Sequence, residues 1–292
     1  MYELVKLSET AYYVDCPSKI GIIKTGEREV FLIDSGNNRE AGKKVLKILT
    51  SEGWSLRGII NTHSHADHIG GNRYLQNNTG CPIYAKGIDR DFTNHPILES
   101  VAAWGGLPID ELKHKFMLAE ESVCDELSPE VLPEGFEIIE LGGHTPDMVG
   151  IRTPDGVAFI ADCLSSRETL DKYKIGFIYD VKTYLETLEC VKNMRAGIFV
   201  PSHAAPCEDI VPLAQYNIDK VGEVSEKILG ILTSPHTFEE LLRELFREYG
   251  MTLTYEQYAL VGSTVRSYIA YLKDRGMIDG VIEDNRLLWK CR

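Results

Sequence analysis

Short apolar runs alternate with amphipathic stretches along most of the chain. Runs of strand type occupy positions 11–14, 21–25, 30–33, 58–60, 82–85, 136–141, 149–152, 157–160 and 197–200. Apolar residues recur at helical spacing over 39–53, 68–77, 181–195 and 208–230. Strands early and late in the chain, with helices between them, predict an α/β fold in which two sheets pack face to face and helices cover their outer faces.

One long segment departs from this alternation. Residues 88–133 contain short helical pieces that are interrupted by polar residues, proline and glycine. Long irregular segments in a compact domain often form a lid or the wall of a binding site. We therefore interpret residues 88–133 as a helical insertion that packs over one end of the sheets, near a site.

The end of the chain has the order of elements of a winged helix. A capping box, Thr237-Phe238-Glu239-Glu240, begins a helix that ends near Gly250. Helical stretches at 255–260 and 263–274 and a hairpin pattern over 277–282 and 286–290 follow. We predict a main domain over residues 1–232 and a small winged-helix-like domain over residues 233–292.

The charge of the chain restricts its partners. The 292 residues carry a net charge of −13, which repels nucleic acid and acidic membranes. Residues 236–292 hold eight Lys and Arg against nine Asp and Glu, so the basic face of a nucleic-acid-binding winged helix is not expected. We expect the tail to serve in packing, in closing a pocket or in forming a homodimer.

The cysteines and the first residues indicate a cytoplasmic protein. Seven cysteines are scattered without a C-x-x-C pair, as expected of reduced thiols. Residues 1–6 lack the basic start and apolar core of a secretion signal, and no apolar run is long enough to cross a membrane. We therefore expect a cytoplasmic location and no membrane partner.

Ligand-type side chains gather in one short segment, His63-Ser64-His65-Ala66-Asp67-His68, directly after an apolar run. Imidazole and carboxylate together suit zinc, iron or manganese. The spacing differs from the helical H-E-x-x-H of zincin proteases. Four ligands would crowd one tetrahedral ion. We therefore expect His63 and His65 to serve one ion, and Asp67 and His68 to be free to serve a second.

Three further ligand-type residues each follow an apolar run. His144 lies in the turn Gly142-Gly143-His144-Thr145-Pro146, where the glycines permit a tight bend. Asp162 directly follows residues 157–161, and His203 comes soon after residues 198–201. Together with the segment at 63–68, these residues complete two ligand sets.

These motifs resemble the metallo-β-lactamase superfamily, with a glyoxalase II-like metal site. The H-x-H-x-D-H segment at 63–68, the later His144, Asp162 and His203, and the early turn Asp34-Ser35-Gly36 match its pattern over about residues 1–230. The resemblance implies an αββα sandwich of two mixed sheets flanked by helices. It also implies two divalent metal ions, with zinc expected first and iron or manganese as alternatives. It places the ligands as follows: His63, His65 and His144 on one ion; Asp67, His68 and His203 on the other; Asp162 bridging both.

The implied chemistry is hydrolysis of a small-molecule substrate by a hydroxide that bridges the two ions. Asp67 would orient that hydroxide or carry its proton. The glyoxalase II-like ligand set favours an ester, a thioester or a lactone, and the winged-helix-like tail differs from the glutathione-binding region of that branch. Tyr179, in Phe177-Ile178-Tyr179-Asp180, is a candidate substrate contact.

Other functions use the same ligand types. A phosphodiesterase or ribonuclease fits the metal site equally well, although the net charge opposes a polyanionic substrate. An iron-dependent persulfide oxygenase needs only part of the ligand set. A β-lactamase that acts on antibiotics is usually exported, and the absence of a visible export signal therefore disfavours β-lactam hydrolysis. From a different class comes a non-enzymatic metal-binding regulator that uses the winged helix.

Overall fold

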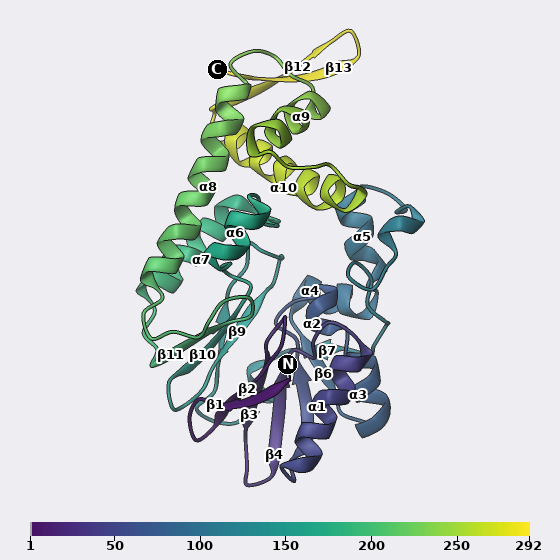
Figure 1. Cartoon of the computed structure of the whole chain (residues 1–292), viewed down its shortest axis with the longest axis vertical. Helices are drawn as coiled ribbons and strands as arrows, with labels where there is room; N and C mark the ends of the chain where they lie inside the picture. Colours follow the sequence, from purple (N-terminus) through teal and green to yellow (C-terminus); the bar gives the residue numbers. More distant parts are fainter. Residues whose placement is uncertain (1) are drawn as a thin grey trace.

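Two β-sheets pack face to face in the lower half of the molecule, and helices cover their outer faces (Figure 1). The structure is a computed structural model that describes residues 2–292. Within these residues the first sheet contains seven strands in chain order: β1 (Glu3–Lys6), β2 (Ala11–Asp15), β3 (Ile20–Lys24), β4 (Glu29–Ile33), β5 (Ser55–Ile60), β6 (Ile83–Ala85) and β7 (Asp125–Glu126).

The second sheet has the order β11 (Ile198–Pro201), β10 (Val157–Ala161), β9 (Val149–Arg152) and β8 (Glu137–Glu140). Its β10–β11 pair is parallel and its other pairs are antiparallel, and the first sheet likewise combines both kinds of pairing. The predicted fold class, two mixed sheets flanked by helices with a small hairpin after the last helices, is confirmed.

The strands alternate their side chains between two cores, because successive residues of a strand point to opposite faces. In β5, Ile60 contributes to the core between the sheets, whereas Ile59 belongs to the core beneath the outer helices. In β10, Phe159 fills the space between the sheets and Ile160 faces the helices on the other side. Both sheets are therefore covered on both faces over their centres.

Four helices cover the outer faces of the sheets in the described part of the chain: α1 (Arg39–Ser51), α3 (Asn72–Thr79), α7 (Val181–Asn193) and α8 (Val211–Ile231). A short helix, α6 (Arg167–Tyr173), packs against α8. Asn38 caps α1 by accepting a hydrogen bond from the backbone N–H of Ala41, and Asp180 caps α7 in the same way. Within residues 2–292, no helix has both the length and the apolar composition that crossing a bilayer requires.

Two sequence predictions in the first half of the chain are wrong in detail. The helix predicted over 68–77 is divided into α2 (Ala66–Ile69) and α3, and Gly70 and Gly71 lie between them. A Cβ atom at Gly71 would lie 2.3 Å from the carbonyl oxygen of Ser35, so close backbone packing requires glycine there. The apolar pattern also did not predict β1 or α6, which are short elements at the surface.

The insertion at 88–133 consists of the short helical pieces that the sequence predicts. They are α4 (Gly87–Asn94), α5 (Ile97–Trp104), η1 (Asp110–Leu112) and η2 (Pro129–Val131). The segment also contributes β7, which pairs in parallel with β6 and extends the first sheet. The insertion therefore forms one edge of the first sheet. It also contacts the tail, because Leu112 and Ala103 pack against Ala259.

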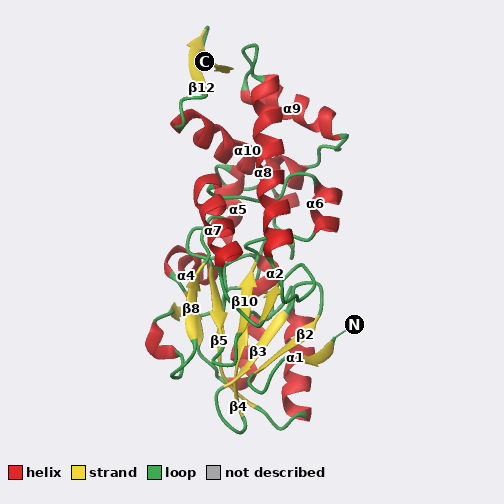
Figure 2. Ribbon diagram, turned by 90° about the vertical axis from the view of Figure 1, so that its left-hand side faces the viewer, coloured by secondary structure: helices red, strands yellow, loops and turns green. Residues whose placement is uncertain are grey.

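The tail contains α9 (Phe238–Tyr249), α10 (Tyr255–Asp274) and the hairpin β12 (Ile278–Glu283) and β13 (Arg286–Cys291), and it lies at the top of the molecule in Figures 1 and 2. The predicted capping box at Thr237 and Glu240 is confirmed. The prediction of separate helical stretches at 255–260 and 263–274 is wrong, since α10 is continuous through Gly262. Glycine inside a helix costs about 1 kcal/mol, and burial of the neighbouring Val261 and Val265 offsets that cost.

The core of the tail continues into the main sandwich. One hydrophobic cluster includes Ala158 of β10, Leu188 of α7, Val221 of α8 and Leu241 of α9, and it continues through Tyr268 of α10 to Ile278 of β12. The long helix α8 thus carries the sandwich core upward into the tail (Figure 2). The division into domains at residues 232 and 233 stays a prediction.

Replacement of Tyr268 should destabilise the whole protein. The side chain is 1% exposed, and Tyr268→Ala should cost roughly 3–5 kcal/mol because it leaves a large cavity. Urea unfolding followed by circular dichroism and by tryptophan fluorescence measures the change. Tyr255→Ala, at a position that is 57% exposed on the same helix, is the control and should change stability by less than about 0.5 kcal/mol. Two separate transitions in the wild-type protein would contradict a shared core.

Candidate metal centre

All seven predicted ligand residues meet at one edge of the sandwich, where strands of both sheets end. His63, His65, Asp67 and His68 follow β5 and lead into α2, and His144 lies in the turn after β8. Asp162 and His203 follow β10 and β11, which are neighbours in the second sheet. A register shift in this pair and the left-handed conformation of Ala161 (φ 50°) accompany the turn into Asp162.

Three imidazoles form the first group of ligand atoms. His65 Nδ1 lies 3.1 Å from His63 Nε2 and 3.0 Å from His144 Nε2. The three nitrogen atoms thus face one common point, and all three side chains are buried or nearly so. This arrangement suits one ion with nitrogen ligands.

The second group combines imidazole and carboxylate. His203 Nε2 lies 3.2 Å from Asp67 Oδ2 and 3.1 Å from Asp162 Oδ2, and His68 Nε2 lies 3.4 Å from Asp162 Oδ1. Asp162 also faces the first group, since its Oδ2 is 3.7 Å from His144 Nε2 and 4.0 Å from His63 Nε2. The carboxylate of Asp162 therefore stands between the two groups.

Two buried ligand atoms support a metal ion at this position. Within the described residues, His68 Nε2 and Asp162 Oδ1 are buried, and apart from facing each other at 3.4 Å they have no hydrogen-bond partner. Buried polar atoms without a partner cost roughly 1–3 kcal/mol each, so a native protein seldom leaves them unpaired. Coordination to a divalent ion would satisfy both, and the imidazole and carboxylate set is one that zinc, iron and manganese accept.

The surroundings divide the histidines into two kinds. Burial lowers the pKa of His63 well below its usual range and, together with the neighbouring His144 ring, lowers the pKa of His65 to about 3. The Asp162 carboxylate raises the pKa of His203 to about 10. Burial opposes the charged form of His68, but the carboxylates of Asp162, Asp67 and Asp34 outweigh it and raise the pKa of His68. The imidazoles of the first group are thus held neutral, whereas carboxylates stabilise the positive charge on the imidazoles of the second group.

A buried aspartate from the first sheet orients both groups. Asp34 Oδ2 accepts hydrogen bonds from His68 Nδ1, at 2.8 Å, and from the hydroxyl of Thr62, at 2.8 Å, and Asp34 Oδ1 accepts one from the backbone N–H of Thr62. The Thr62 oxygen is also 2.9 Å from His63 Nδ1. Proton donation from the Nδ1 atoms leaves the Nε2 lone pairs of His63 and His68 free for a metal ion.

Two acidic residues of the insertion reach the centre, and the sequence pattern did not single them out. Asp89 on α4 is buried and accepts hydrogen bonds from the backbone N–H of Ser64 and from the hydroxyl of Thr145, which connects the segments that carry His65 and His144. Glu99 on α5 has its Oε1 atom 3.7 Å from His65 Nε2, and burial followed by the charge of Asp67 raises its pKa. The helical spacing of the insertion gives no signal for either contact.

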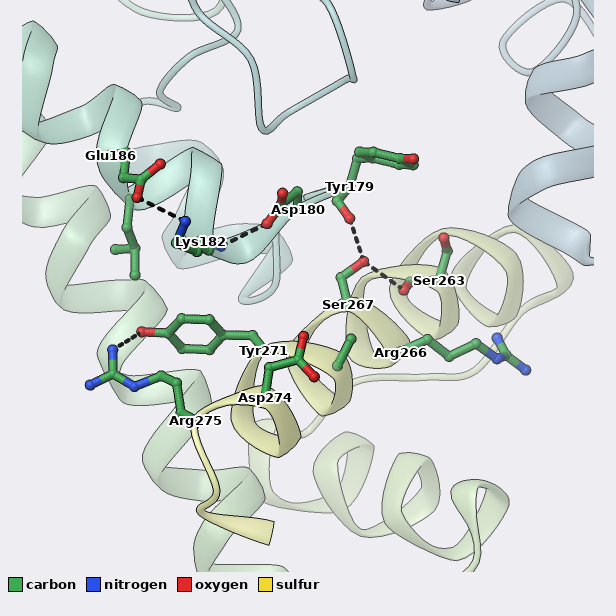
Figure 3. A pocket seen from close by; sticks show the side chains of 12 residues that line it. Tyr179, Asp180, Lys182, Glu186, Ser263, Arg266, Ser267, Tyr271, Asp274 and Arg275 are labelled. Carbon is green, nitrogen blue, oxygen red and sulfur yellow. Dashed lines mark hydrogen bonds and ion pairs between the residues drawn. The ribbon is translucent and has the colours of Figure 1, made fainter. Parts of the chain in front are cut away.

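The remaining candidates lie away from the ligand atoms. Tyr179 is 54% exposed at the edge of an open cleft of about 960 Å³ between α7 and α10 (Figure 3). Two further histidines also lie outside the group of candidate ligands: His95 is exposed at the end of α4, and His114 lies 3.3 Å from Glu256 in the tail. A role of Tyr179 in substrate binding stays a prediction.

Comparison with known families gives one match that covers most of the chain. The family model described as the metallo-beta-lactamase superfamily matches residues 13–203, which include all seven ligand residues. The curated relatives match more locally. A hydroxyacylglutathione hydrolase of Methylococcus capsulatus is 46% identical over 46 residues, which are 16% of this chain and 18% of that protein. Hydroxyacylglutathione hydrolase GloC of Haemophilus influenzae is 26% identical over 156 residues, which are 53% of this chain and 68% of that protein.

Among solved structures, a beta-lactamase domain protein from Burkholderia ambifaria has the same fold. The two structures superpose with a TM-score of 0.77 over 99% of this chain and 94% of that one, at 15% sequence identity. At this identity the likeness shows the fold alone. Because it extends over nearly the whole chain, it includes the tail as well as the sandwich.

Substitution of Asp34 should weaken metal binding without removing a ligand. In Asp34→Asn, the amide group facing His68 Nδ1 would donate a hydrogen bond, which favours the tautomer that carries its proton on Nε2 and cannot bind an ion. We expect affinity for zinc to fall by roughly 10–100-fold, as measured by competition with a chelator. Asp284→Asn is the matched control, because Asp284 is also left-handed (φ 49°) but exposed in the hairpin turn. Equal affinities in wild type and Asp34→Asn would contradict the orienting role.

Proposed function

The chain belongs to the metallo-β-lactamase superfamily, and we propose that it is a metal-dependent hydrolase that acts on an ester, a thioester or a lactone. One observation carries the proposal: seven imidazole and carboxylate side chains converge at one edge of the sandwich, with two buried ligand atoms that lack a hydrogen bond within the described residues. Convergence of this kind is what a metal-activated nucleophile requires.

In this proposal each ligand group holds one divalent ion. His63, His65 and His144 would hold the first and Asp67, His68 and His203 the second, and Asp162 could serve both because its oxygens face both groups. When bound, such ions supply a nucleophile from water near neutral pH and polarise the carbonyl oxygen of the substrate. Two carboxylates neutralise only part of the charge of two divalent ions. The centre therefore favours a developing negative charge inside a protein of net charge −13.

Asp67 is the residue that we assign to proton transfer. Its side chain is 35% exposed, the most open of the seven ligands, and Asp67 Oδ2 accepts a hydrogen bond of 2.7 Å from the hydroxyl of Ser18. His203, at 29%, is the next most open. Substrate can therefore approach from the side of these two residues. Burial opposes the charged form of Asp67, but His68 and His203 outweigh it and lower the pKa of this carboxylate, so Asp67 would pass a released proton on to the open side instead of holding it.

The substrate class follows from charge and from the relatives. A net charge of −13 repels polyanions at long range and leaves a neutral acyl bond unaffected. Two relatives are named hydroxyacylglutathione hydrolases, which supports an acyl substrate, but the alignments cover only part of this chain. The proposal therefore specifies the acyl bond and leaves the alcohol or thiol that departs unspecified.

A substrate panel tests the proposal. Purified protein should hydrolyse model thioesters, lactones or aryl esters, lose this activity on treatment with a chelator, and regain it with zinc, manganese or iron. Metal content is measured in parallel by elemental analysis. Turnover of a model phosphodiester and of RNA with no turnover of any acyl substrate would overturn the acyl assignment. Failure of all three metals to restore any hydrolysis would overturn the hydrolase itself.

Asp162→Ala should lose metal and activity together. Its carboxylate faces both ligand groups, so its loss should lower kcat/KM by more than the roughly 10–100-fold that loss of an outer partner of a metal ligand causes. Metal content and hydrolysis are measured on the same preparation. Asp110→Ala, at an aspartate whose side chain is 94% exposed in the insertion, is the control. Retained activity in Asp162→Ala with metal still bound would contradict the shared role.

A further inference from the structure

The ring of His144 is held by a short loop that precedes α7. The carbonyl oxygen of Phe177 lies 3.0 Å from His144 Nδ1, on the side of the ring opposite to the ligand atom Nε2. The backbone N–H groups of Tyr179 and Asp180 both donate to the carbonyl oxygen of Gly143, each at 3.0 Å. The loop 176–180 therefore fixes both the ring and the backbone of this ligand.

The turn that carries His144 also depends on close packing against α7. Gly143 has a φ of 116°, and a Cβ atom there would lie 2.3 Å from the backbone nitrogen of Tyr184. The hydroxyl of Thr187 donates a hydrogen bond of 2.6 Å to the carbonyl oxygen of Gly142. His144 can thus move only if the loop 176–180 and the start of α7 move with it.

The loop itself is fastened to the tail. The backbone N–H of Ile178 donates to the hydroxyl oxygen of Thr264 on α10, at 3.1 Å, and Thr264 is completely buried. One helical turn further along, the hydroxyl of Ser267 donates to the carbonyl oxygen of Tyr179 at 2.7 Å (Figure 3). Two consecutive residues of the loop are therefore bonded to one face of α10.

The insertion contacts α10 near its N-terminal end. Trp104 of α5 packs edge-on against Tyr258, with 5.8 Å between ring centroids, and His114 lies 3.3 Å from Glu256. The first turns of α10 are thus held by the insertion, whereas its middle holds the loop 176–180. This arrangement gives α10 a defined place above the metal centre.

From these contacts we propose that the tail is part of the metal centre, with Thr264 as a positioning residue that acts on His144 through the loop 176–180. The acceptor at Nδ1 keeps the proton on that atom and leaves the Nε2 lone pair for the ion. Without the Thr264 hydroxyl, the buried N–H of Ile178 loses its partner. The loop then shifts to find another partner, and the Phe177 carbonyl moves away from His144.

The inference rests on the metal centre of the proposed function, but its readout is metal binding and is independent of any substrate. If wild-type protein binds no divalent ion, the proposed function fails. If wild type binds ions and the tail variants bind them equally well, only the role of the tail fails.

The test compares Thr264→Val, Thr264→Ser and Ser263→Ala in the full chain. Valine keeps the shape of threonine without the hydroxyl, serine keeps the hydroxyl, and Ser263 lies beside Thr264 on α10, where its hydroxyl makes no hydrogen bond to the loop within the described residues. Zinc affinity is measured by chelator competition. Thr264→Val should lower the affinity for one of the two ions roughly 10–100-fold, and Thr264→Ser and Ser263→Ala should stay within about 3-fold of wild type.

A second readout separates positioning from a merely structural role. In ¹⁵N-detected NMR of the zinc-bound protein, the His144 proton should lie on Nδ1 in wild type and Thr264→Ser, and its signal should shift or broaden in Thr264→Val. A variant that is less stable to urea but keeps both affinities and the His144 signal would overturn the proposal. If Thr264→Val does not fold, Ser267→Ala replaces it, and an unchanged affinity in that variant would overturn the proposal equally.

Discussion

The hydrogen bonds to the Asp34 carboxylate are the constraint on which the centre depends. This one side chain fixes His68 directly and His63 through the Thr62 hydroxyl, so one ligand of each group is oriented from the same point. Asp34 can do this because it lies at the end of β4, beside the end of β5, in a left-handed conformation (φ 64°) that aspartate tolerates better than most residues. The close approach of Gly71 to Ser35 keeps the turn after β4 next to the segment that carries His68.

The two groups of candidate ligands differ in how they accommodate charge in a buried site. In the first group, burial among other imidazoles keeps the rings neutral, which is the form that binds a metal ion. In the second group, the carboxylates of Asp67 and Asp162 stabilise charge on His68 and His203. A divalent ion that enters the second group takes the place of that positive charge. The same carboxylates thus offset positive charge on the imidazoles and are the ones that would bind the proposed ion.

The sequence predicts which candidate ligand residues come together, because each of them directly follows or lies close after a strand. Each candidate ligand follows a strand, and β10 and β11 are parallel neighbours, so the pattern of apolar runs already brings Asp162 and His203 to one edge. His63 follows β5 of the other sheet, and it meets them because the two sheets pack face to face. The outer partners are different. Asp89, Glu99 and Thr264 belong to helices whose docking is decided by tertiary packing, and neither periodicity nor spacing encodes which face of α10 meets the loop 176–180. For the same reason, Gly262 suggested a helix break that packing removes.

The outer partners connect the metal centre to the stability of the whole fold. The candidate ligands come from segments far apart in the sequence, and three of the five imidazoles are fixed by a partner from another segment. Asp34, directly after β4, fixes His68, the loop 176–180 fixes His144, and the carbonyl oxygen of Pro17 lies 3.1 Å from His203 Nδ1. An unfolded chain cannot assemble this set, so binding of an ion favours the folded state. Because the continuous core joins the sandwich to α10, that gain extends to the tail as well. If Thr264 has the proposed positioning role, ion binding and docking of the tail would be coupled parts of one equilibrium.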